Sequence, residues 1–375
     1  MNALALALKN PWRRMIAVDA AIMVALFLYK VLYHKPVLEY LHLVVDYHFG
    51  FAKRAFIGAL LSAVLPVVPV WLVYALGAAI WLLALLLFLK LFARTFGFAE
   101  ATAPLFAFMF GSPFFLKNFL QTIGYFDIYG CVWLLVALLL PARSLAYPAL
   151  GAVGGAALIL IHPVHMLLYV PALCVIVAMR FYFMRPVAPL EIASGLLLAA
   201  SLAAVFLLCA FHGEMPVPLD QLAAYLRGRI ASDSYLRPEV LDIWYRPISD
   251  DIARTWSILP ENMARLPIFL GLIALHWPLL RYFRELITAL ANVWHRRLTL
   301  LGMAGVTVGY IIIGAVVFDY SRWFSSWATC MLLILHAVKM LPARHVAPLP
   351  ADDRRNRVFG WLVTAVPRIG ISKPF

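Results

Sequence analysis

The residues of this chain that could do chemistry are ionisable side chains placed between long apolar stretches. Asp46 is followed by Tyr47-His48-Phe49-Gly50 and then by the basic pair Lys53-Arg54. A carboxylate in such a place can act as a general base toward an acceptor hydroxyl, while nearby cations stabilise a departing phosphate. We therefore predict Asp46 as a catalytic residue. The predicted ligands of the substrate or its phosphate are Lys53, Arg54, Asp127, His162, His165, Arg246, Asp319 and Arg322.

Each of these side chains also has a simpler interpretation. Asp127 stands at the expected N-terminus of a helix, where the helix dipole favours a carboxylate. The basic residues could anchor lipid headgroups beside interfacial aromatic side chains. A zinc site at His162 and His165 is disfavoured, because the sequence has no H-E-x-x-H or comparable ligand set. Asp46 and Asp127 could instead hold Mg²⁺ or Mn²⁺ together with substrate phosphates, so a metal requirement stays open.

The elements that must position these residues are transmembrane helices. Of the 375 residues, 65% are hydrophobic, and the mean hydropathy is +0.90, whereas soluble domains are roughly 45–50% apolar. The apolar residues form repeated runs near the roughly 20 residues that a helix needs to cross a bilayer. We predict an all-α polytopic bundle of about ten spans with no soluble domain. The spans are expected at residues 15–33, 70–92, 101–116, 127–141, 147–162, 164–180, 190–211, 265–281, 298–318 and 323–341.

Two connections on the outer side are long, residues 34–69 and 212–264. The first contains the apolar piece Ala55–Leu65, which is too short to cross and is ended by Pro66. An interfacial helix fits this piece best, and a re-entrant hairpin is the alternative. The second loop interleaves aromatic and basic residues, which suits a sugar or its phosphate. Residues 1–341 are predicted as the transmembrane domain and residues 342–375 as a basic cytoplasmic tail.

The net charge of +13 comes from 31 Lys and Arg against 18 Asp and Glu. Because Lys and Arg accumulate on the cytoplasmic side of membrane proteins, this charge indicates orientation in a membrane and not binding of nucleic acid. Placing the basic short loops inside gives an N-in, C-in topology, in what we predict to be the bacterial inner membrane. All the candidate site residues then face the outer side, and ionisable side chains at membrane depth usually mark function.

This loop layout resembles that of the membrane-embedded glycosyltransferases of the C superfold, which use polyprenyl-phosphate-linked sugars. In that superfamily the first outer loop holds the catalytic Asp and interfacial helices, the second often carries another acidic residue, and a long outer loop joins spans seven and eight. Here those places are taken by Asp46 with Ala55–Leu65, by Asp127, and by residues 212–264. The string Asp46-Tyr47-His48-Phe49-Gly50 is also similar to the Asp-Glu-x-His-Phe-Gly motif of protein O-mannosyltransferases, with Tyr47 where that family has Glu.

The resemblance implies a transferase that moves a sugar from a polyprenyl-phosphate donor to an acceptor on the outer, periplasmic face. Two other functions fit the same residues. A polysaccharide polymerase or ligase acting on undecaprenyl-diphosphate glycans needs the same outer face and the same cations. A transporter or flippase could use Asp127, His165 and Asp319 to relay protons or bind its substrate, although such proteins usually show repeat symmetry and ionisable residues near the membrane midplane. The expected partners are the lipid-linked sugar, a glycan acceptor and membrane lipids.

Overall fold

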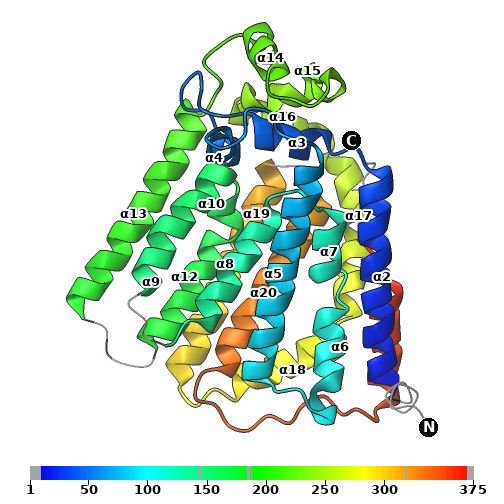
Figure 1. Ribbon diagram of the computed structural model, residues 1–375. Helices are drawn as coiled ribbons and strands as arrows, with labels where there is room; N and C mark the ends of the chain where they lie inside the picture. The colour runs from blue at the N-terminus through cyan, green and yellow to red at the C-terminus, as the bar shows by residue number, and fades with distance from the viewer. Residues whose placement is uncertain (1–9, 143–145, 184–185, 187, 317–318, 370–375) are drawn as a thin grey trace.

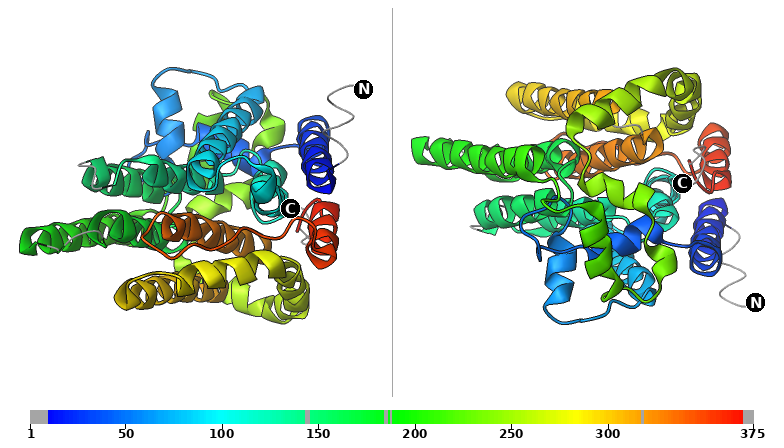
Figure 2. Two further views of the ribbon diagram at one scale, coloured as in Figure 1. Left: turned by 90° about the horizontal axis from the view of Figure 1, so that it is seen from below. Right: turned by 90° about the horizontal axis from the view of Figure 1, so that it is seen from above.

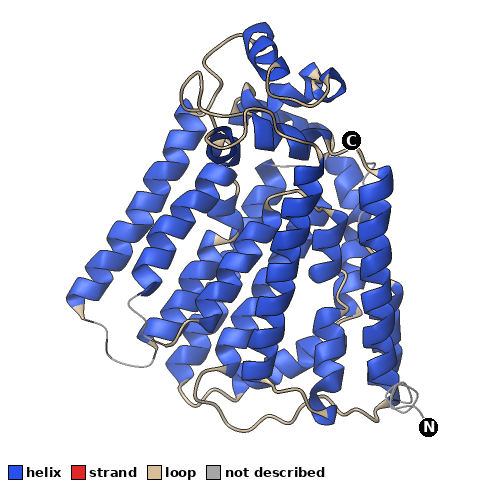
Figure 3. Cartoon of the chain, in the orientation of Figure 1, coloured by secondary structure: helices blue, strands red, loops and turns tan. Residues whose placement is uncertain are grey.

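The computed structural model describes residues 10–142, 146–183, 186, 188–316 and 319–369. These residues form an all-helical bundle with no strand element (Figures 1 and 3), which confirms the all-α part of the predicted fold. Five helical segments are long and apolar enough to cross a membrane, or six if one bent pair counts as a span. The five are α2 (Pro11–Tyr33), α5 (Trp71–Thr95), the run of α11, α12 and η3 (His165–Tyr182), α13 (Pro189–His212) and α19 (Val293–Val316).

The other bundle helices are shorter or less apolar than the predicted spans. They are η1 (Glu100–Thr102), α6 (Ala103–Phe110), α7 (Leu116–Gln121), α8 (Asp127–Leu139), α9 (Ala146–Ala149), η2 (Leu150–Gly154), α10 (Gly155–Ile161) and α20 (Tyr320–Lys339). Between α6 and α7 the chain breaks at Ser112-Pro113, because the residue before a proline is disfavoured in the helical region. The hydropathy of the sequence therefore predicted about ten spans, whereas the lengths and compositions of the helices in the structure support five or six.

The chain bends inside the predicted span at residues 265–281, so this stretch is either a broken span or a re-entrant segment. Helix α17 (Leu259–Ala274) ends, and α18 (Trp277–Thr288) begins at an angle of 67° to it. Pro278 fits the first turn of α18, where its missing N–H has no helical partner to lose. Helix α18 lies across the end of the bundle where the chain begins (Figure 1).

The two long loops come together at the other end of the bundle and form what we call the cap (Figure 1). Its helices are α3 (Val37–Val44), α4 (Phe56–Ser62), α14 (Leu219–Arg227), η4 (Asp233–Tyr235), α15 (Pro238–Leu241), η5 (Asp242–Trp244) and α16 (Ile248–Ser257). Tyr40 and Trp244 are fully buried in a shared apolar cluster. The Tyr40 hydroxyl donates to the Val68 carbonyl and accepts from the Ala231 N–H at 2.8 Å. The loops are therefore one structural unit.

Helix α4 is the counterpart of the predicted helix at Ala55–Leu65, and it is shorter, with seven residues. It is seen end-on in Figure 1 and so runs across the direction of the long helices. It packs on α3 through Gly58, because a Cβ placed there would lie 1.9 Å from the Val45 carbonyl oxygen.

We expect Gly58→Ala to lower the thermal stability of the detergent-purified protein, since the added methyl must push α4 away from α3. Overpacking of this kind costs about 1–3 kcal/mol. Gly271→Ala is the matched control, because a Cβ at Gly271 meets no atom within 4 Å. Equal melting temperatures for the two variants would show that the contact between α3 and α4 is not tight.

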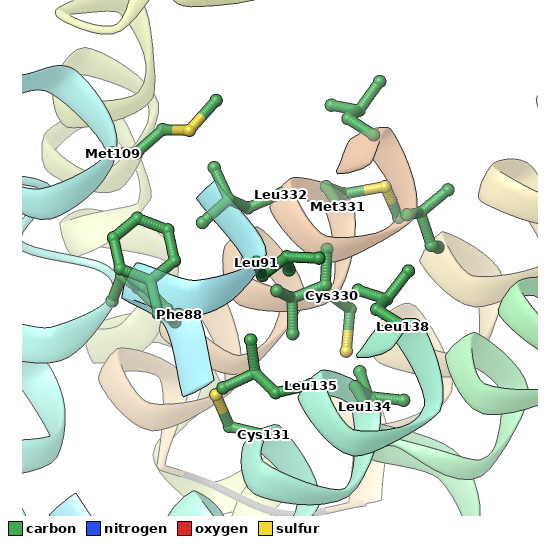
Figure 4. Packing of buried hydrophobic residues seen from close by; sticks show 14 of the residues in the cluster. Phe88, Leu91, Met109, Cys131, Leu134, Leu135, Leu138, Cys330, Met331 and Leu332 are labelled. Atoms are coloured by element: carbon green, nitrogen blue, oxygen red, sulfur yellow. The ribbon is translucent and has the colours of Figure 1, made fainter. Parts of the chain in front are cut away.

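The main core lies between α5, α8 and α20. Figure 4 shows Leu91, Leu135 and Cys330, one from each of these helices, packed together with their neighbours. Cys131 and Cys330 are buried free thiols within this cluster. They act there as small apolar side chains.

The segment predicted to be a basic cytoplasmic tail contains the helix α21 (Arg354–Ala365), which lies beside α2 (Figure 2). The Trp12 indole N–H donates to the Ala351 carbonyl at 2.9 Å, near the start of α2. Arg368 lies within electrostatic range of Lys30, near the end of α2. The described C-terminal segment thus has contacts near both ends of α2.

Candidate functional site

Charged side chains gather where the cap meets the bundle. Asp127 begins α8, His165 begins α11, and Asp319 and Arg322 stand at the start of α20. The cap contributes the remaining members, Lys53, Arg54 and Arg246 from its loops and Asp251 from α16. Seven of the nine residues predicted from the sequence therefore belong to this region. An eighth, His162, lies beside it, and the ninth, Asp46, has a separate set of partners.

The centre of this region is a buried ion pair between Arg322 and Asp127. Arg322 Nε lies 2.6 Å from Asp127 Oδ2 and Nη2 lies 2.8 Å from Oδ1, so the pair is bidentate. Arg322 Nη1 also lies 3.2 Å from Asp319 Oδ2, and the guanidinium carbon stands 4.5 Å from the centre of the Tyr125 ring. Asp127 is only 2% exposed. Two carboxylates thus neutralise Arg322, which makes it a structural cation and a poor candidate for a free phosphate ligand.

Arg54 has the opposite character. Within the described parts of the chain its guanidinium makes no hydrogen bond or ion pair, and its Nε is enclosed without an acceptor. Burial lowers the pKa of Arg54 from 12.5 to about 10, so the side chain stays charged at neutral pH. The charges that act on it most are Asp251, Arg322, Arg246 and Asp127, in that order. A half-buried cation without a partner is costly unless an anion joins it.

The backbone at Arg54 is also unusual. Its φ is +63°, and among the described residues no other non-glycine residue has a positive φ. This left-handed conformation costs roughly 1–2 kcal/mol for an L-residue with a Cβ. Strain of this kind persists where the surrounding structure over-determines it, and it is concentrated at binding and catalytic sites. The cap therefore holds Arg54 in a backbone conformation that costs free energy.

Lys53 and Arg246 connect the two loops. The Lys53 ammonium donates to the Arg246 carbonyl, and the Lys53 N–H donates to the Gly213 carbonyl at 2.7 Å. Burial and the neighbouring Arg54 lower the pKa of Lys53. The Arg246 guanidinium is paired with Asp242 and lies 3.4 Å from Asp251 Oδ1. These two cations raise the positive potential around Arg54 while they fix the loops to each other.

The histidines lie next to this group and form no metal centre. The rings of His162 and His165 are 5.9 Å apart at their centroids. In the described residues no three His, Cys, Asp or Glu side chains are grouped closely enough to hold a metal ion. His42, which the sequence did not single out, lies between Phe126 and Trp244 with ring centroids 5.1 and 5.2 Å away.

The polar atoms of His42 and Trp244 are further evidence for a site at this end. Both ring nitrogens of His42 and the Trp244 Nε1 are buried without a hydrogen-bond partner among the described residues. Such orphaned atoms are rare in folded proteins and are commonly satisfied by water or a ligand. Together with Arg54 Nε they make four buried polar atoms of the cap region that have no hydrogen-bond partner among the described residues.

Asp46 does not join this group of orphaned atoms, because its carboxylate is fully engaged. Oδ2 accepts from the Tyr225 hydroxyl at 2.8 Å and from Arg229, and Oδ1 accepts from the His48 N–H at 3.0 Å. Arg229 is 7% exposed. The suggested metal pair of Asp46 and Asp127 is likewise not formed, since each carboxylate has its own arginine. The predicted catalytic role of Asp46 would require Arg229 to release it.

An apolar groove of about 460 Å³ lies between α16, α17, α19 and α20. Its walls include Leu266, Leu270, Ile311 and Trp327. One end of the groove is formed by Thr255 on α16, whose hydroxyl donates to the Asp251 carbonyl at 2.7 Å. Tyr320 and Trp323, on either side of Arg322, also line it. The groove therefore reaches the parts of α16 and α20 that carry Asp251 and Arg322.

Two further ionisable residues escaped the sequence analysis. Asp19 of α2 and Lys117 of α7 are both fully buried, with Lys117 Nζ 2.6 Å from Asp19 Oδ1. The available signal was a carboxylate inside the apolar run of the first span, together with a lysine inside the aromatic stretch after Pro113. Ionisable residues in such places are expensive and deserve attention as a pair.

Comparisons with known proteins add no assignment to this site. The chain matches no protein-family description, no curated protein and no solved structure.

Proposed function

We propose that this protein is a membrane-embedded glycosyltransferase that moves a sugar from a polyprenyl-phosphate donor to an acceptor at the cap. The observation that carries the proposal is Arg54, a half-buried cation without a carboxylate partner, held in a strained conformation. It lies in the same charged region as Asp251 and Arg322, where an apolar groove ends. This combination suits an amphiphile with an anionic head and a long hydrocarbon chain.

In this proposal the phosphate of the donor binds Arg54, with Lys53 adding positive potential from the adjacent position. The hydrocarbon chain lies in the groove between α17, α19 and α20. The acceptor hydroxyl oxygen attacks the anomeric carbon and forms the new glycosidic bond, while the bond from that carbon to the phosphate oxygen breaks. The phosphate leaves with the electron pair, which Arg54 stabilises, and a carboxylate takes the hydroxyl proton. The anomeric configuration is inverted.

Asp251 is the carboxylate whose surroundings suit the proton transfer best. It is the charged group that acts most strongly on Arg54, and its side chain is 29% exposed. Its one described ion-pair contact is with Arg246, at 3.4 Å. Asp46, the base predicted from the sequence, is held by Arg229 and Tyr225. We therefore propose Asp251 as the base and a structural role for Asp46 in joining the two loops.

The remaining parts of the proposal concern place and orientation. We propose that the cap faces the outer, periplasmic side of a bacterial inner membrane, because the basic short loops lie at the other end. In such an orientation α4 is the interfacial helix of the first outer loop. The proposal also includes about ten membrane segments, if the short helices and broken pairs pass through the bilayer inside the bundle, where protein surrounds them.

Transport is the second candidate, and specific observations favour it. The pair Asp19 and Lys117 is buried inside the bundle, and helix breaks occur nearby at α6–α7 and α17–α18. Broken helices and buried charges of this kind line the substrate sites of many secondary transporters. Uptake of a substrate into proteoliposomes without covalent change would favour this function over the transferase.

The test of the transferase is sugar transfer by the purified protein from a panel of undecaprenyl-phosphate monosaccharides to an added glycan acceptor. We expect Asp251→Asn to lower the rate of transfer at least about 100-fold, because general-base assistance contributes this much or more. The control is Asp233→Asn, since Asp233 has an exposed side chain paired only with Arg227 at 4.0 Å. Undiminished transfer by Asp251→Asn would remove Asp251 from the mechanism, and loss in Asp46→Asn without loss of stability would restore Asp46 to it.

A further inference from the structure

The ion pair of Asp19 and Lys117 has a third participant, the C-terminal segment. Besides its contact with Asp19, Lys117 Nζ donates to the carbonyls of Thr364 and Val366, each at 3.2 Å. The Thr364 hydroxyl donates to Asp19 Oδ2 at 3.1 Å. The first span, α7 and the end of α21 are thus joined at a single buried polar point.

These contacts provide hydrogen-bond donors for carbonyl groups at the end of α21. The last carbonyls of a helix have no partner inside the helix, and in hydrocarbon each unpaired backbone group is costly. Helix α21 ends at Ala365 and the chain then continues without helical structure to Ile369. Lys117 supplies both hydrogen bonds and a positive charge at a helix C-terminus, where the helix dipole favours a cation.

The segment could not hold this position through its own hydropathy. Helix α21 carries Arg354, Arg355 and Arg357 in its first turn and does not qualify as a helix able to cross a membrane. It is joined to α20 by residues 340–353, which contain no helix. Its buried apolar side chains are few, with Val363 and Ile369 the main ones. The polar contacts with α2 and α7 must therefore supply much of what keeps it against the bundle.

The last described residue of the segment packs in a cluster with side chains that line the groove. Ile369 is buried in a cluster with Phe114 and Phe269, against which Tyr320 and Phe324 also pack. Tyr320 and Phe324 are themselves walls of the apolar groove. The segment thus contacts, from behind, the helices that form the groove and carry Arg322.

We propose that residues 354–369 form a strap whose position against the bundle depends on the Asp19–Lys117 pair. Without the pair, the carbonyls of Thr364 and Val366 lose their donor, and the strap leaves the bundle while the rest of the fold remains. Release of the strap removes the support behind α17 and α20. This inference does not depend on the chemistry proposed above, because it concerns only where the C-terminal segment lies.

The experiment measures the exposure of the strap by maleimide labelling of Ile369→Cys in native membranes opened to the reagent on both sides. Ile369 is 2% exposed, so we expect slow labelling in the otherwise unaltered chain. Adding Asp19→Asn or Lys117→Met is expected to raise the labelling rate at least tenfold. Adding Arg281→Met is the control, because it removes an exposed ion pair with Glu285 on α18.

Cys330 of α20 is an internal reporter for global unfolding, since it is fully buried in the main core. Labelling at residue 369 with Cys330 still protected supports release of the strap. Labelling at both positions overturns the proposal, because the pair would then stabilise the whole bundle. Protection at both positions in Asp19→Asn and Lys117→Met overturns it as well. No substrate is present, so the result is independent of transferase activity.

Discussion

Replacing Arg54 by Gly is expected to abolish sugar transfer while the protein melts at the same temperature as the unaltered chain or at a higher one. The loss of activity follows from the proposed mechanism, in which the donor phosphate loses Arg54, a cation that has no ion pair within the described parts of the chain. Removing one charge-stabilising donor from an active site costs about 100- to 1,000-fold in rate. We expect a loss at least this large, since Arg54 contributes both to binding and to departure of the phosphate.

Two effects explain why Arg54→Gly is expected to keep or raise the melting temperature. Glycine adopts a positive φ without steric cost, so the strain at φ +63° disappears. The unpaired guanidinium is also removed from its enclosed position, where burial disfavours its charge. A residue can destabilise the free protein and still be needed for activity. This combination is expected at a site whose groups are prearranged for a ligand.

A second variant separates charge from strain. Arg54→Met keeps a side chain in the left-handed conformation and removes the charge, so it should lose activity as Arg54→Gly does, without the relief of backbone strain. Arg227→Met is the control, because Arg227 is an exposed cap residue. The measurements are transfer from undecaprenyl-phosphate sugars and thermal unfolding in detergent. If both Arg54 variants transferred sugar normally, Arg54 would not be the phosphate ligand.

The class of fold could be read from composition, because a chain with mean hydropathy +0.90 must bury its backbone polar groups in helices. The long uninterrupted spans α2, α5, α13 and α19 were found for the same reason. The bend between α17 and α18 was not found, since hydropathy averages over residues and carries no information about direction. The position of α21 beside α2 was not predicted from the sequence, because its arginines are typical of a cytoplasmic tail. Lys117, which contacts the end of α21, lies more than 200 residues earlier in the chain.

The site was predicted in part for a similar reason. Topology alone could bring Asp127, Arg54 and Arg322 to one end of the bundle, because each follows or precedes a span. It could not tell which cations are neutralised, since that depends on pairings such as Arg229 with Asp46 between distant loops. The sequence thus favoured Asp46 as the base, whereas we propose Asp251, because Asp46 is held by Arg229 and Tyr225. Whether a charged residue has a structural or a functional role depends on its ion-pair partners, and these partners are set by tertiary packing.

Removing Arg322 should have the opposite effect on stability from removing Arg54, although both arginines lie in the same charged region. Arg322 is the partner of the buried Asp127 carboxylate through two hydrogen bonds and of Asp319 through a third. In Arg322→Met the Asp127 carboxylate stays buried without a cation. Breaking a buried pair in this way costs about 3–5 kcal/mol, so we expect a large fall in the midpoint of denaturant unfolding in detergent.

The double variant Asp127→Leu with Arg322→Met tests the cause of that loss. Replacing both members of a buried ion pair by apolar groups of similar size is often neutral, so the double variant should recover most of the stability that Arg322→Met loses. Arg281→Met, which breaks an exposed pair, should change stability by no more than about 0.5 kcal/mol. If the double variant were as unstable as the single one, packing of Arg322 against Tyr125 and Trp323 would be the dominant contribution, and the ion pair would not be.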